Sequence, residues 1–299
     1  MALINFDVST IILPDGESIK SFKEFERTCL KMLSIGCDRY SSIITLGGGA
    51  VGDLSGFVAS TYMRGIEYFQ IPTTFLGMID SSIGGKTAVN ANERKNIIGT
   101  IYQPKSVFID PNFLKSLDKK EVNSGFGEMI KYGAIWDKDL FEKISTWLDN
   151  TSSFPFEKAI IDAVKIKSEI VSKDEKEKGL RRILNFGHTI GHAIESYYGY
   201  ERIKHGEAVA FGMKCAGFIS NRKRLLSLEA KNKLFRILEK LTLPNISDID
   251  KKEIIKKIKS DKKNKKGKVK FVLLSDIGKT KIVSSVPQNL IEDSLEILR

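Results

Sequence analysis

The sequence of 299 residues is poor in cysteine, proline and long apolar runs. Its three cysteines, Cys29, Cys37 and Cys215, are odd in number and lack metal-binding spacing, so we expect reduced thiols in a reducing compartment, the cytoplasm. Seven prolines exclude a collagen-like or low-complexity chain. No stretch approaches the roughly 18 apolar residues of a membrane helix. The N-terminus lacks a basic stretch followed by an apolar one, so no secretory signal is expected.

Positive charge is concentrated in one segment of the chain. The formal net charge is +11, and eleven lysines between Lys251 and Lys270 oppose only Glu253 and Asp261. The remainder is nearly neutral and no aromatic residue is interleaved before Phe271, so we expect no nucleic-acid partner. The run is typical of a solvated lysine-rich helix and turn. The alternative is that one or two of its lysines hold an anionic ligand.

Hydrophobic patterning predicts an α/β fold in two parts. Strands are expected at 8–13, 43–46, 66–71 and 106–109, and helices at 22–33 and 51–63. Strands that alternate with helices imply a parallel sheet with crossover helices. From about residue 115 the period becomes helical, with helices expected near 119–135, 137–149, 156–173, 187–198, 206–223 and 228–241, then a hairpin of 269–274 with 280–283 and a helix after Pro287.

The histidines are unusually clustered. All three, His188, His192 and His205, lie within eighteen residues. On a helix, Arg181, Asn185, His188 and His192 would line one polar, cationic face, whereas a stripe facing the core would be apolar. Two or three imidazoles with a carboxylate would suit zinc with an open position for substrate. Spacing alone does not say which histidines are ligands, and a solvated face with chance histidines is the alternative.

Two further motifs are ambiguous by themselves. Glu128 and Lys131, three residues apart, are most often a surface ion pair when nothing else is known. The glycines 47–49 join a strand to a helix, where backbone amides can receive a phosphate, although a tight turn explains them equally well. The segment 84–87 (GGKT) ends like a P-loop, but that motif requires glycine where Asp80 stands, so an ATPase is excluded.

Taken together, the segments resemble the 3-dehydroquinate synthase family. The matching stretches are GGGAVGDLSGFVASTYMRG (47–65), IPTTFLGMIDSSIGGKTAVN (71–90), KNIIGTIYQPKSVFID (95–110), GFGEMIKYG (125–133), KSEIVSKDEKEKGLRRILNFGHTIGHAIE (167–195) and HGEAVAFGM (205–213). The resemblance spans residues 8–298, and the combined pattern is highly specific. It implies an α/β fold with a Rossmann-like parallel-sheet domain at 1–114 that binds NAD, followed by a mostly α-helical domain at 115–299 that binds metal and substrate.

The resemblance also implies a reaction. Members of the family are lyases of the shikimate pathway, which leads to the aromatic amino acids. They cyclise 3-deoxy-D-arabino-heptulosonate 7-phosphate to 3-dehydroquinate with release of phosphate. NAD would accept a hydride and return it, and Zn²⁺ or Co²⁺ would polarise the substrate hydroxyls. The implied partners are this small sugar acid phosphate and a second copy of the chain in a homodimer, with neither nucleic acid nor membrane.

The family's functional residues transfer position by position. Glu128, His188 and His205 would bind the metal, with His192 handling a proton nearby. The substrate hydroxyls and carboxylate would contact Asp80, Lys131, Lys167, Arg181 and Asn185. The substrate phosphate would be held by Lys86, Asn96, Lys262 or its neighbour Lys263, and Arg64 from the partner subunit. NAD would be held by Gly47, Gly48, Gly49, Asp53, Thr73, Thr74 and Lys95, with Glu17 and Lys20 beside the adenosine.

One departure from the family's pattern concerns the N-terminal side. Family members begin several dozen residues earlier, with a further strand and helix whose residues help to hold NAD. The printed sequence starts at the strand expected at 8–13, so we expect part of that pocket to be absent and a sheet edge or apolar surface to be exposed.

Several other functions compete with this one. They are a sugar phosphate cyclase of the amino-dehydroquinate or deoxy-inosose type, an inactive paralogue acting as a binding protein, and a zinc alcohol dehydrogenase. Arg181 together with Asn185 favours the dehydroquinate type over the deoxy-inosose type. A dehydrogenase would have no use for residues that hold both a phosphate and a carboxylate.

Overall fold

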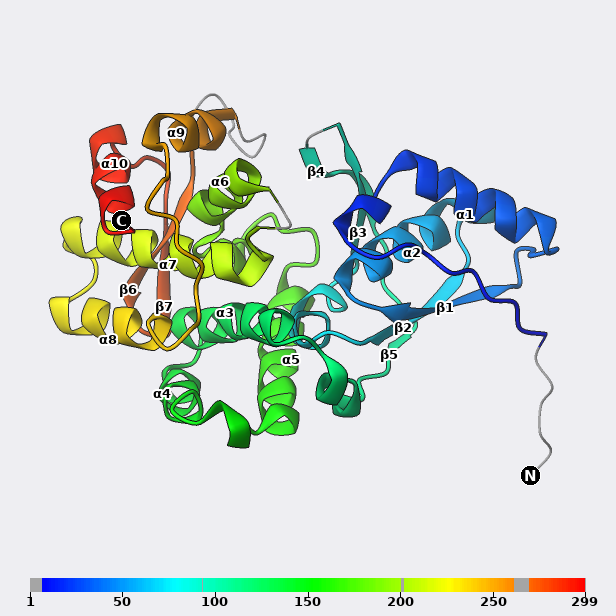
Figure 1. Ribbon diagram of the computed structural model, residues 1–299, viewed down its shortest axis with the longest axis horizontal. Coiled ribbons are helices and arrows are strands. Elements are labelled where there is room, and N and C mark those ends of the chain that lie inside the picture. Colours follow the sequence, from blue (N-terminus) through cyan, green and yellow to red (C-terminus); the bar gives the residue numbers. More distant parts are fainter. Residues whose placement is uncertain (1–6, 93, 200–201, 261–268, 299) are drawn as a thin grey trace. The chain divides into compact units, whose positions relative to one another are not determined.

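The computed structural model describes residues 7–92, 94–199, 202–260 and 269–298 (Figure 1). The chain divides into two compact units. The first comprises Met1–Thr73 and Ser81–Asp110, and the second comprises Thr74–Asp80 and Pro111–Arg299. The short segment Thr74–Asp80, hereafter the crossing segment, therefore interrupts the first unit in sequence and belongs to the second. None of the described helices is long and apolar enough to cross a bilayer.

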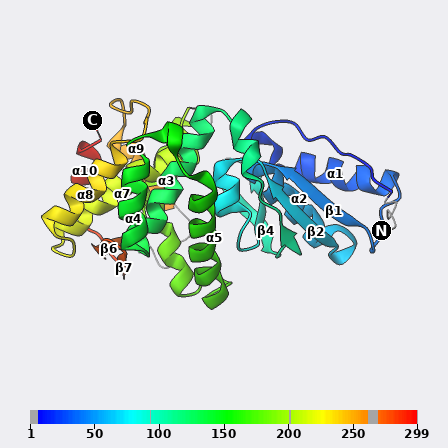
Figure 2. The ribbon, with the colours of Figure 1, turned by 90° about the horizontal axis from the view of Figure 1, so that it is seen from below.

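The first unit is built on a three-stranded parallel sheet of order β1-β2-β5. Its strands are β1 (Ser42–Gly47), β2 (Glu67–Pro72) and the two-residue β5 (Ser106–Val107). Helix α2 (Gly49–Thr61) is the crossover between β1 and β2, and α1 (Phe22–Ser34) precedes them. Figure 2 shows both helices beside these strands. The strands expected at 43–46 and 66–71 and the helices expected at 22–33 and 51–63 are confirmed, and the strand expected at 106–109 is confirmed over its first two residues.

The two faces of this sheet differ in burial. On one face Tyr68 is 1% exposed and packs in a core with Leu54 and Val58 of α2. On the other face Ile44 and Leu46 are 67% and 57% exposed. Their register partners on β2, Phe69 and Ile71, lie on the same side and are half-buried. Parallel sheets are normally covered on both faces, so within the described residues this sheet has one bare apolar face.

Two features of the first unit were not predicted correctly. The strand expected at 8–13 is wrong, because residues 7–14 form neither helix nor strand. Ile11 and Leu13 pack on the core while Ile12 stays 82% exposed, but no described strand pairs with the segment. The antiparallel pair β3 (Lys86–Ala91) and β4 (Arg94–Ile101) was missed. The sequence cue for this pair was a polar turn around Asn92 between two segments that contain β-branched residues. Asn92 has a φ of 53°, which asparagine tolerates in turns.

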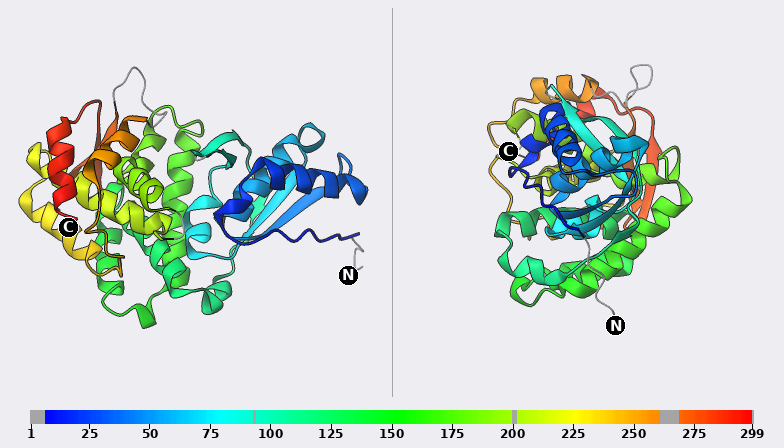
Figure 3. Two further views of the ribbon diagram at one scale, coloured as in Figure 1. Left: turned by 45° about the horizontal axis from the view of Figure 1, so that its top comes forward. Right: turned by 90° about the vertical axis from the view of Figure 1, so that its right-hand side faces the viewer.

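The second unit is mainly helical. Its helices are α3 (Lys119–Ile135), α4 (Lys138–Trp147), α5 (Phe156–Lys173), α6 (His188–Tyr198), α7 (His205–Arg222), α8 (Leu228–Leu238), α9 (Lys251–Ser260) and α10 (Gln288–Glu296). A hairpin of β6 (Phe271–Asp276) and β7 (Lys279–Val283) completes it (Figure 3). All helices expected from residue 115 onward, the hairpin and the last helix are confirmed. Helix α9 occupies the first half of the lysine-rich run.

An aromatic cluster anchors the crossing segment in the second unit. Phe75 is fully buried, and its ring centroid lies 5.6 Å from that of Phe126 on α3 and 5.2 Å from that of Phe156 on α5. Phe154 lies 6.1 Å from Phe75 in the same edge-to-face manner. Burial of the Phe75 ring therefore fixes the crossing segment, and with it the position of Asp80.

Candidate metal and substrate site

The histidines do not share one helix with Arg181 and Asn185. Residues Leu180–Asn185 form a 3₁₀-helix, and Gly187 has a φ of 79° before α6 begins at His188. The helical face predicted from Arg181 to His192 is therefore wrong, because the non-helical Phe186 and the left-handed Gly187 separate the two helical segments. A Cβ at Gly187 would lie 2.8 Å from the Val209 carbonyl oxygen, so this position requires glycine. The break places His188 at the first turn of α6.

Close backbone packing brings α3 and α7 together. A Cβ at Gly206, near the start of α7, would collide with the carbonyl oxygen of Ser124 on α3. A Cβ at Gly127 would likewise collide with the carbonyl oxygen of Gly206. The Gly206 amide donates a hydrogen bond of 3.0 Å to Ser124 Oγ. Because these two glycines allow backbone contact, Glu128 of α3 and His205 of α7 face each other.

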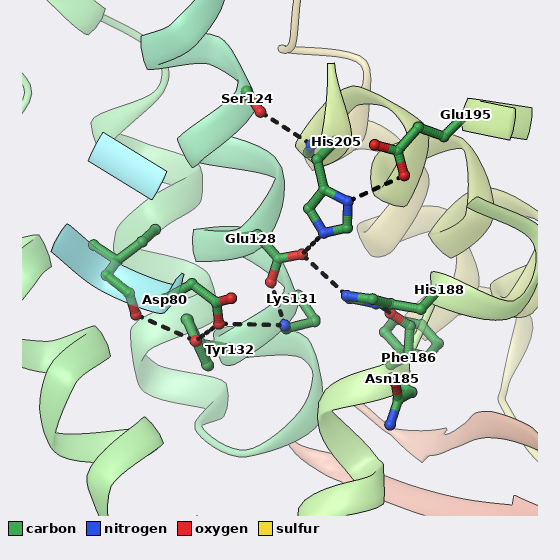
Figure 4. Close-up of polar contacts among 12 residues, drawn as sticks. Asp80, Ser124, Glu128, Lys131, Tyr132, Asn185, Phe186, His188, Glu195 and His205 are labelled. Carbon is green, nitrogen blue, oxygen red and sulfur yellow. Dashed lines mark hydrogen bonds and ion pairs between the residues drawn. The ribbon is translucent and has the colours of Figure 1, made fainter. Parts of the chain in front are cut away.

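Glu128 and two histidines have the geometry of a metal site (Figure 4). Glu128 Oε1 lies 3.4 Å from His188 Nε2 and 3.5 Å from His205 Nε2. Ligands placed tetrahedrally at about 2.0–2.1 Å from zinc are about 3.3 Å apart, which these separations match. Glu128 is 0% exposed, and neither of its oxygens accepts a conventional hydrogen bond in the described part of the chain. The donor set and its burial therefore fit a divalent cation.

Lys131 is the second neighbour of Glu128. Its ammonium forms an ion pair with Glu128 Oε2, and its side chain is 2% exposed. The pair is therefore not the surface ion pair that its spacing alone would favour, because α3 packs both side chains into the interior. Because solvent does not reach this pair, the protein groups around it must offset the cost of burying its two charges.

Outer contacts orient both imidazoles. His188 Nδ1 lies 3.1 Å from the Phe186 carbonyl oxygen, so this nitrogen carries the proton and Nε2 presents a lone pair. His205 Nδ1 lies 3.4 Å from Glu195 Oε2, a carboxylate–histidine arrangement typical of metal centres. His192 is the third imidazole, with its ring centroid 5.1 Å from that of His188. Ring nitrogens of all three histidines lie within 4.8 Å of one another, so a three-histidine set is the geometric alternative.

The electrostatic environment separates the two imidazoles that face Glu128. Burial, together with the nearby Lys131 ammonium, holds the pKa of His188 well below its usual range, so this ring is neutral at pH 7. Burial also lowers the pKa of His205, but Glu195 and Glu128 outweigh it and raise that pKa to about 10. A cation bound at Nε2 of His205 would replace this proton.

A second polar cluster surrounds Asp80 of the crossing segment. Lys167 Nζ lies 2.9 Å from Asp80 Oδ1, and Lys131 Nζ lies 3.9 Å from the same oxygen. The hydroxyl of buried Tyr132 donates to this carboxylate. Burial raises the pKa of Asp80, but Lys167 and Lys131 outweigh it and hold the pKa well below its usual range. Tyr132 was missed in the sequence, although it directly follows Lys131 in the matched segment 125–133.

Arg181 and Asn185, the other expected substrate-binding residues of the second unit, lie in the segment before α6. Arg181 is 1% exposed, and its guanidinium donates to the Glu175 carbonyl oxygen. The Asp174 carboxylate accepts the Arg181 amide at 2.9 Å. Asn185 Nδ2 donates to Glu177 Oε1. The second unit therefore contains all the metal-ligand candidates. It also contains the residues expected to contact the substrate hydroxyls and carboxylate, which are Asp80, Lys131, Lys167, Arg181 and Asn185.

Most of the residues expected to hold NAD lie in the first unit. Lys20 is 3% exposed, and its ammonium lies 2.6 Å from Asp53 Oδ2 and 3.5 Å from Glu17 Oε1. Lys95 Nζ lies 3.6 Å from the same Glu17 oxygen, and Asn96 accepts a hydrogen bond from Lys20. Burial lowers the pKa of Lys20, but Asp53 and Glu17 outweigh it and raise the pKa. The fold therefore brings these five side chains into one network.

The glycine turn at 47–49 connects β1 directly to α2. Gly47 ends β1, Gly48 precedes α2 as its N-cap, and Gly49 begins α2. The Thr73 amide donates to the Gly47 carbonyl oxygen at 3.0 Å. Thr74 lies in the second unit, where its hydroxyl accepts the Gly77 amide at 3.0 Å. Arg64, Lys86 and Asn96 are exposed residues of the first unit, and Lys262 lies outside the described residues.

The fold is that of the sugar phosphate cyclases. One solved relative is 2-epi-5-epi-valiolone synthase from Streptomyces hygroscopicus subsp. jinggangensis, with NAD⁺ and Zn²⁺ bound. It is 28% identical with a TM-score of 0.87, over 96% of this chain and 81% of that one. Another is 2-deoxy-scyllo-inosose synthase complexed with carbaglucose-6-phosphate, NAD⁺ and Co²⁺. It is 30% identical with a TM-score of 0.86, over 95% of this chain and 81% of that one.

Within that class, the chain belongs to the 3-dehydroquinate synthase family. The family's N-terminal domain matches residues 10–124, and its C-terminal domain matches residues 125–264. The 3-dehydroquinate synthase of Thermoanaerobacter sp. (strain X514) is 48% identical over 283 residues, which are 93% of this chain and 80% of that protein.

Proposed function

We propose that this protein cyclises 3-deoxy-D-arabino-heptulosonate 7-phosphate to 3-dehydroquinate with release of phosphate, using NAD and a divalent metal, Zn²⁺ or Co²⁺. The observation that carries the proposal is the buried Glu128 carboxylate, with one oxygen 3.4 and 3.5 Å from two imidazole Nε2 atoms. Lys131 contacts both Glu128 and Asp80, so it joins this centre to the cluster of charged groups beside it. Family membership supports the same reaction.

Glu128, His188 and His205 would hold the metal ion in this proposal. Once bound, the ion supplies Lewis acidity that polarises a substrate hydroxyl or carbonyl. The chain's own groups fix the ligands, since Phe186 orients His188 and Glu195 orients His205. His192 stands beside the two ligand rings, where its imidazole would take or return a proton.

The charged residues of the second unit would bind the acid end of the substrate. Lys131, Lys167 and Arg181 supply positive charge, while Asp80 and Asn185 supply hydrogen-bond acceptors and donors for hydroxyls. Lys86, Asn96 and Lys262 would hold the phosphate. The glycine turn with Asp53, Thr73, Thr74, Lys95, Glu17 and Lys20 would hold NAD. We therefore assign NAD binding to residues 1–114, and metal and most substrate binding to residues 115–299, with Asp80, Lys86 and Asn96 as substrate-binding residues outside that range.

Release of inorganic phosphate from the seven-carbon keto acid phosphate tests the function directly. We expect release that requires both NAD and Zn²⁺ or Co²⁺, with no net reduction of NAD. A folded protein that binds both cofactors and releases no phosphate would contradict the proposal. The same assay with sugar phosphates that lack the carboxylate distinguishes cyclases of the deoxy-inosose and valiolone types, because those cyclases should prefer them.

Arg181→Ala should weaken substrate binding without removing the metal. A buried charge-assisted hydrogen bond to the carboxylate is worth roughly 1.5–3 kcal/mol, so KM should rise about 10- to 150-fold. Metal content per chain should stay at the wild-type value. Arg181→Lys is the matched variant, since it keeps the charge and should lose less affinity. Loss of the metal in Arg181→Ala would contradict the role given to this residue.

We also propose a cytoplasmic homodimer in which Arg64 reaches the partner's site. Met63 and Arg64 have φ angles of 48° and 70°, in the left-handed region, and they form a strained turn that presents an exposed Arg64. The three free cysteines fit a reducing compartment. Light scattering should give twice the chain mass of 33.5 kDa, and the single mass would contradict the dimer.

A further inference from the structure

A small recess lies beneath the glycine turn of the first unit. Its lining includes Gly47–Gly49, Thr45 of β1, Gln70 of β2 and Ser82. The recess measures about 10 Å³, which is close to the space that one water molecule needs. It therefore lies between the carboxyl ends of two parallel strands and the start of α2, where open α/β sheets bind ligands.

Two hydroxyls of this recess have no hydrogen-bond partner. Thr45 and Ser82 are each 4% exposed. Thr45 Oγ1 and Ser82 Oγ are buried, and no group in the described part of the chain accepts from them or donates to them. A buried hydroxyl without a partner lowers the stability of the folded state. No group in the described part of the first unit satisfies either hydroxyl, so we expect a bound molecule to supply the missing hydrogen bonds.

The end of α2 above the recess provides donors for an anion. Helix α2 has 13 residues, and Gly48 at its N-cap gives no side-chain hydrogen bond to the first amides. Free amides at a helix N-terminus, with the helix dipole behind them, favour a phosphate group. The recess is too small for a phosphate, so the hydroxyls reach such a ligand only through a smaller molecule.

We infer that Thr45 and Ser82 hold one water molecule beneath the glycine turn, and that this water donates a hydrogen bond to the diphosphate of NAD bound at the N-terminus of α2. The inference rests on the NAD binding proposed above, and it adds two residues to that site. A bridging water of this kind is nearly as favourable as a direct hydrogen bond when it has at least two polar partners.

Two variants remove the hydroxyls while keeping the shape of the site. Thr45→Val and Ser82→Ala should each raise the Kd for NAD, measured by titration calorimetry, about 5- to 30-fold. Without NAD, Thr45→Val should lower Tm by about 2–4 °C, because the water loses a partner. Thr28→Val is the matched control, since Thr28 is 7% exposed and its hydroxyl is already bonded to the Glu24 carbonyl oxygen. It should leave the Kd unchanged.

Two results would overturn the inference. One is a Kd for NAD within twofold of the wild-type value in both variants. The other is a higher Tm for NAD-free Thr45→Val, since that marks a hydroxyl with no water beside it. Failure of the wild-type protein to bind NAD would instead contradict the proposed function, and the Tm comparison would still decide whether the water is present. If Thr45→Val does not fold, Ser82→Ala decides both points.

Discussion

Replacing His188 by alanine should remove the metal and the release of phosphate together. His188 contributes one of the two Nε2 atoms that face Glu128 Oε1, at 3.4 Å, and its ring is held by the Phe186 carbonyl oxygen. Losing one of three protein ligands leaves the cation too weakly held to persist through dialysis. Since Lewis acidity is worth several kcal/mol, phosphate release should fall at least about a thousandfold. Metal content per chain and phosphate release are measured on the same preparation.

His192→Ala is the matched control for this experiment. The His192 ring lies beside those of His188 and His205, yet we assign it to proton handling. This variant should therefore keep the full metal content while losing activity. The contrary result is metal loss in His192→Ala with metal retained in Glu128→Gln. It would mean that the three histidines bind the ion and that Glu128 has been assigned wrongly.

Gly206→Ala should destabilise the second unit and disrupt the metal centre at once. The added methyl group would collide with the Ser124 carbonyl oxygen, which is backbone and cannot rotate away. Helices α3 and α7 must then separate, which increases the distance between Glu128 and His205. We expect the free energy of unfolding to fall by about 3 kcal/mol, at the upper end for an overpacked core. Denaturant unfolding measures this change, and metal content is measured in parallel.

Gly217→Ala on the same helix is its control. A Cβ there would meet Leu234 Cδ2 at 2.7 Å, the movable end of a side chain. The gain in helix propensity, about 1 kcal/mol, offsets the small rearrangement, so stability should change little. Equal stability and full metal content in the two variants would show that the contact between α3 and α7 does not position the ligands.

The second unit was predictable because its sequence follows the helical period, and helices such as α4 and α8 bury one face. The helix expected at 119–135 coincides with α3, since apolar residues recur with the helical period and Asp118 caps the first turn at Lys120. Strands were predicted less accurately than helices, because a strand is stable only beside a neighbouring strand, which can lie far away in the sequence. The segment 8–13 is rich in β-branched residues yet has no described neighbour, whereas β3 and β4 stabilise each other across the turn at Asn92.

The sequence identified the candidate site residues mainly through resemblance, and it left their environment open. Helical spacing predicted that Arg181 and His192 share one helix face, because spacing alone does not reveal the left-handed conformation of Gly187 between them. The spacing of Glu128 and Lys131 alone favoured a surface pair, and only the resemblance predicted their roles, because the packing of α3 that buries them leaves no local pattern in the sequence. The hydrogen bond from Tyr132 to Asp80 depends on where the crossing segment packs, which no local pattern encodes.

The crossing segment also limits how this chain can be divided or recombined. Thr74–Asp80 lies within the sequence of the first unit but packs in the second, where Phe75 sits within the aromatic cluster and Asp80 binds Lys167. A gene fragment that begins at Pro111 would lack both side chains and leave a hole in the aromatic core. No single cut therefore separates the two units intact. A chimera of two cyclases must take the crossing segment from the same parent as the helices that enclose it.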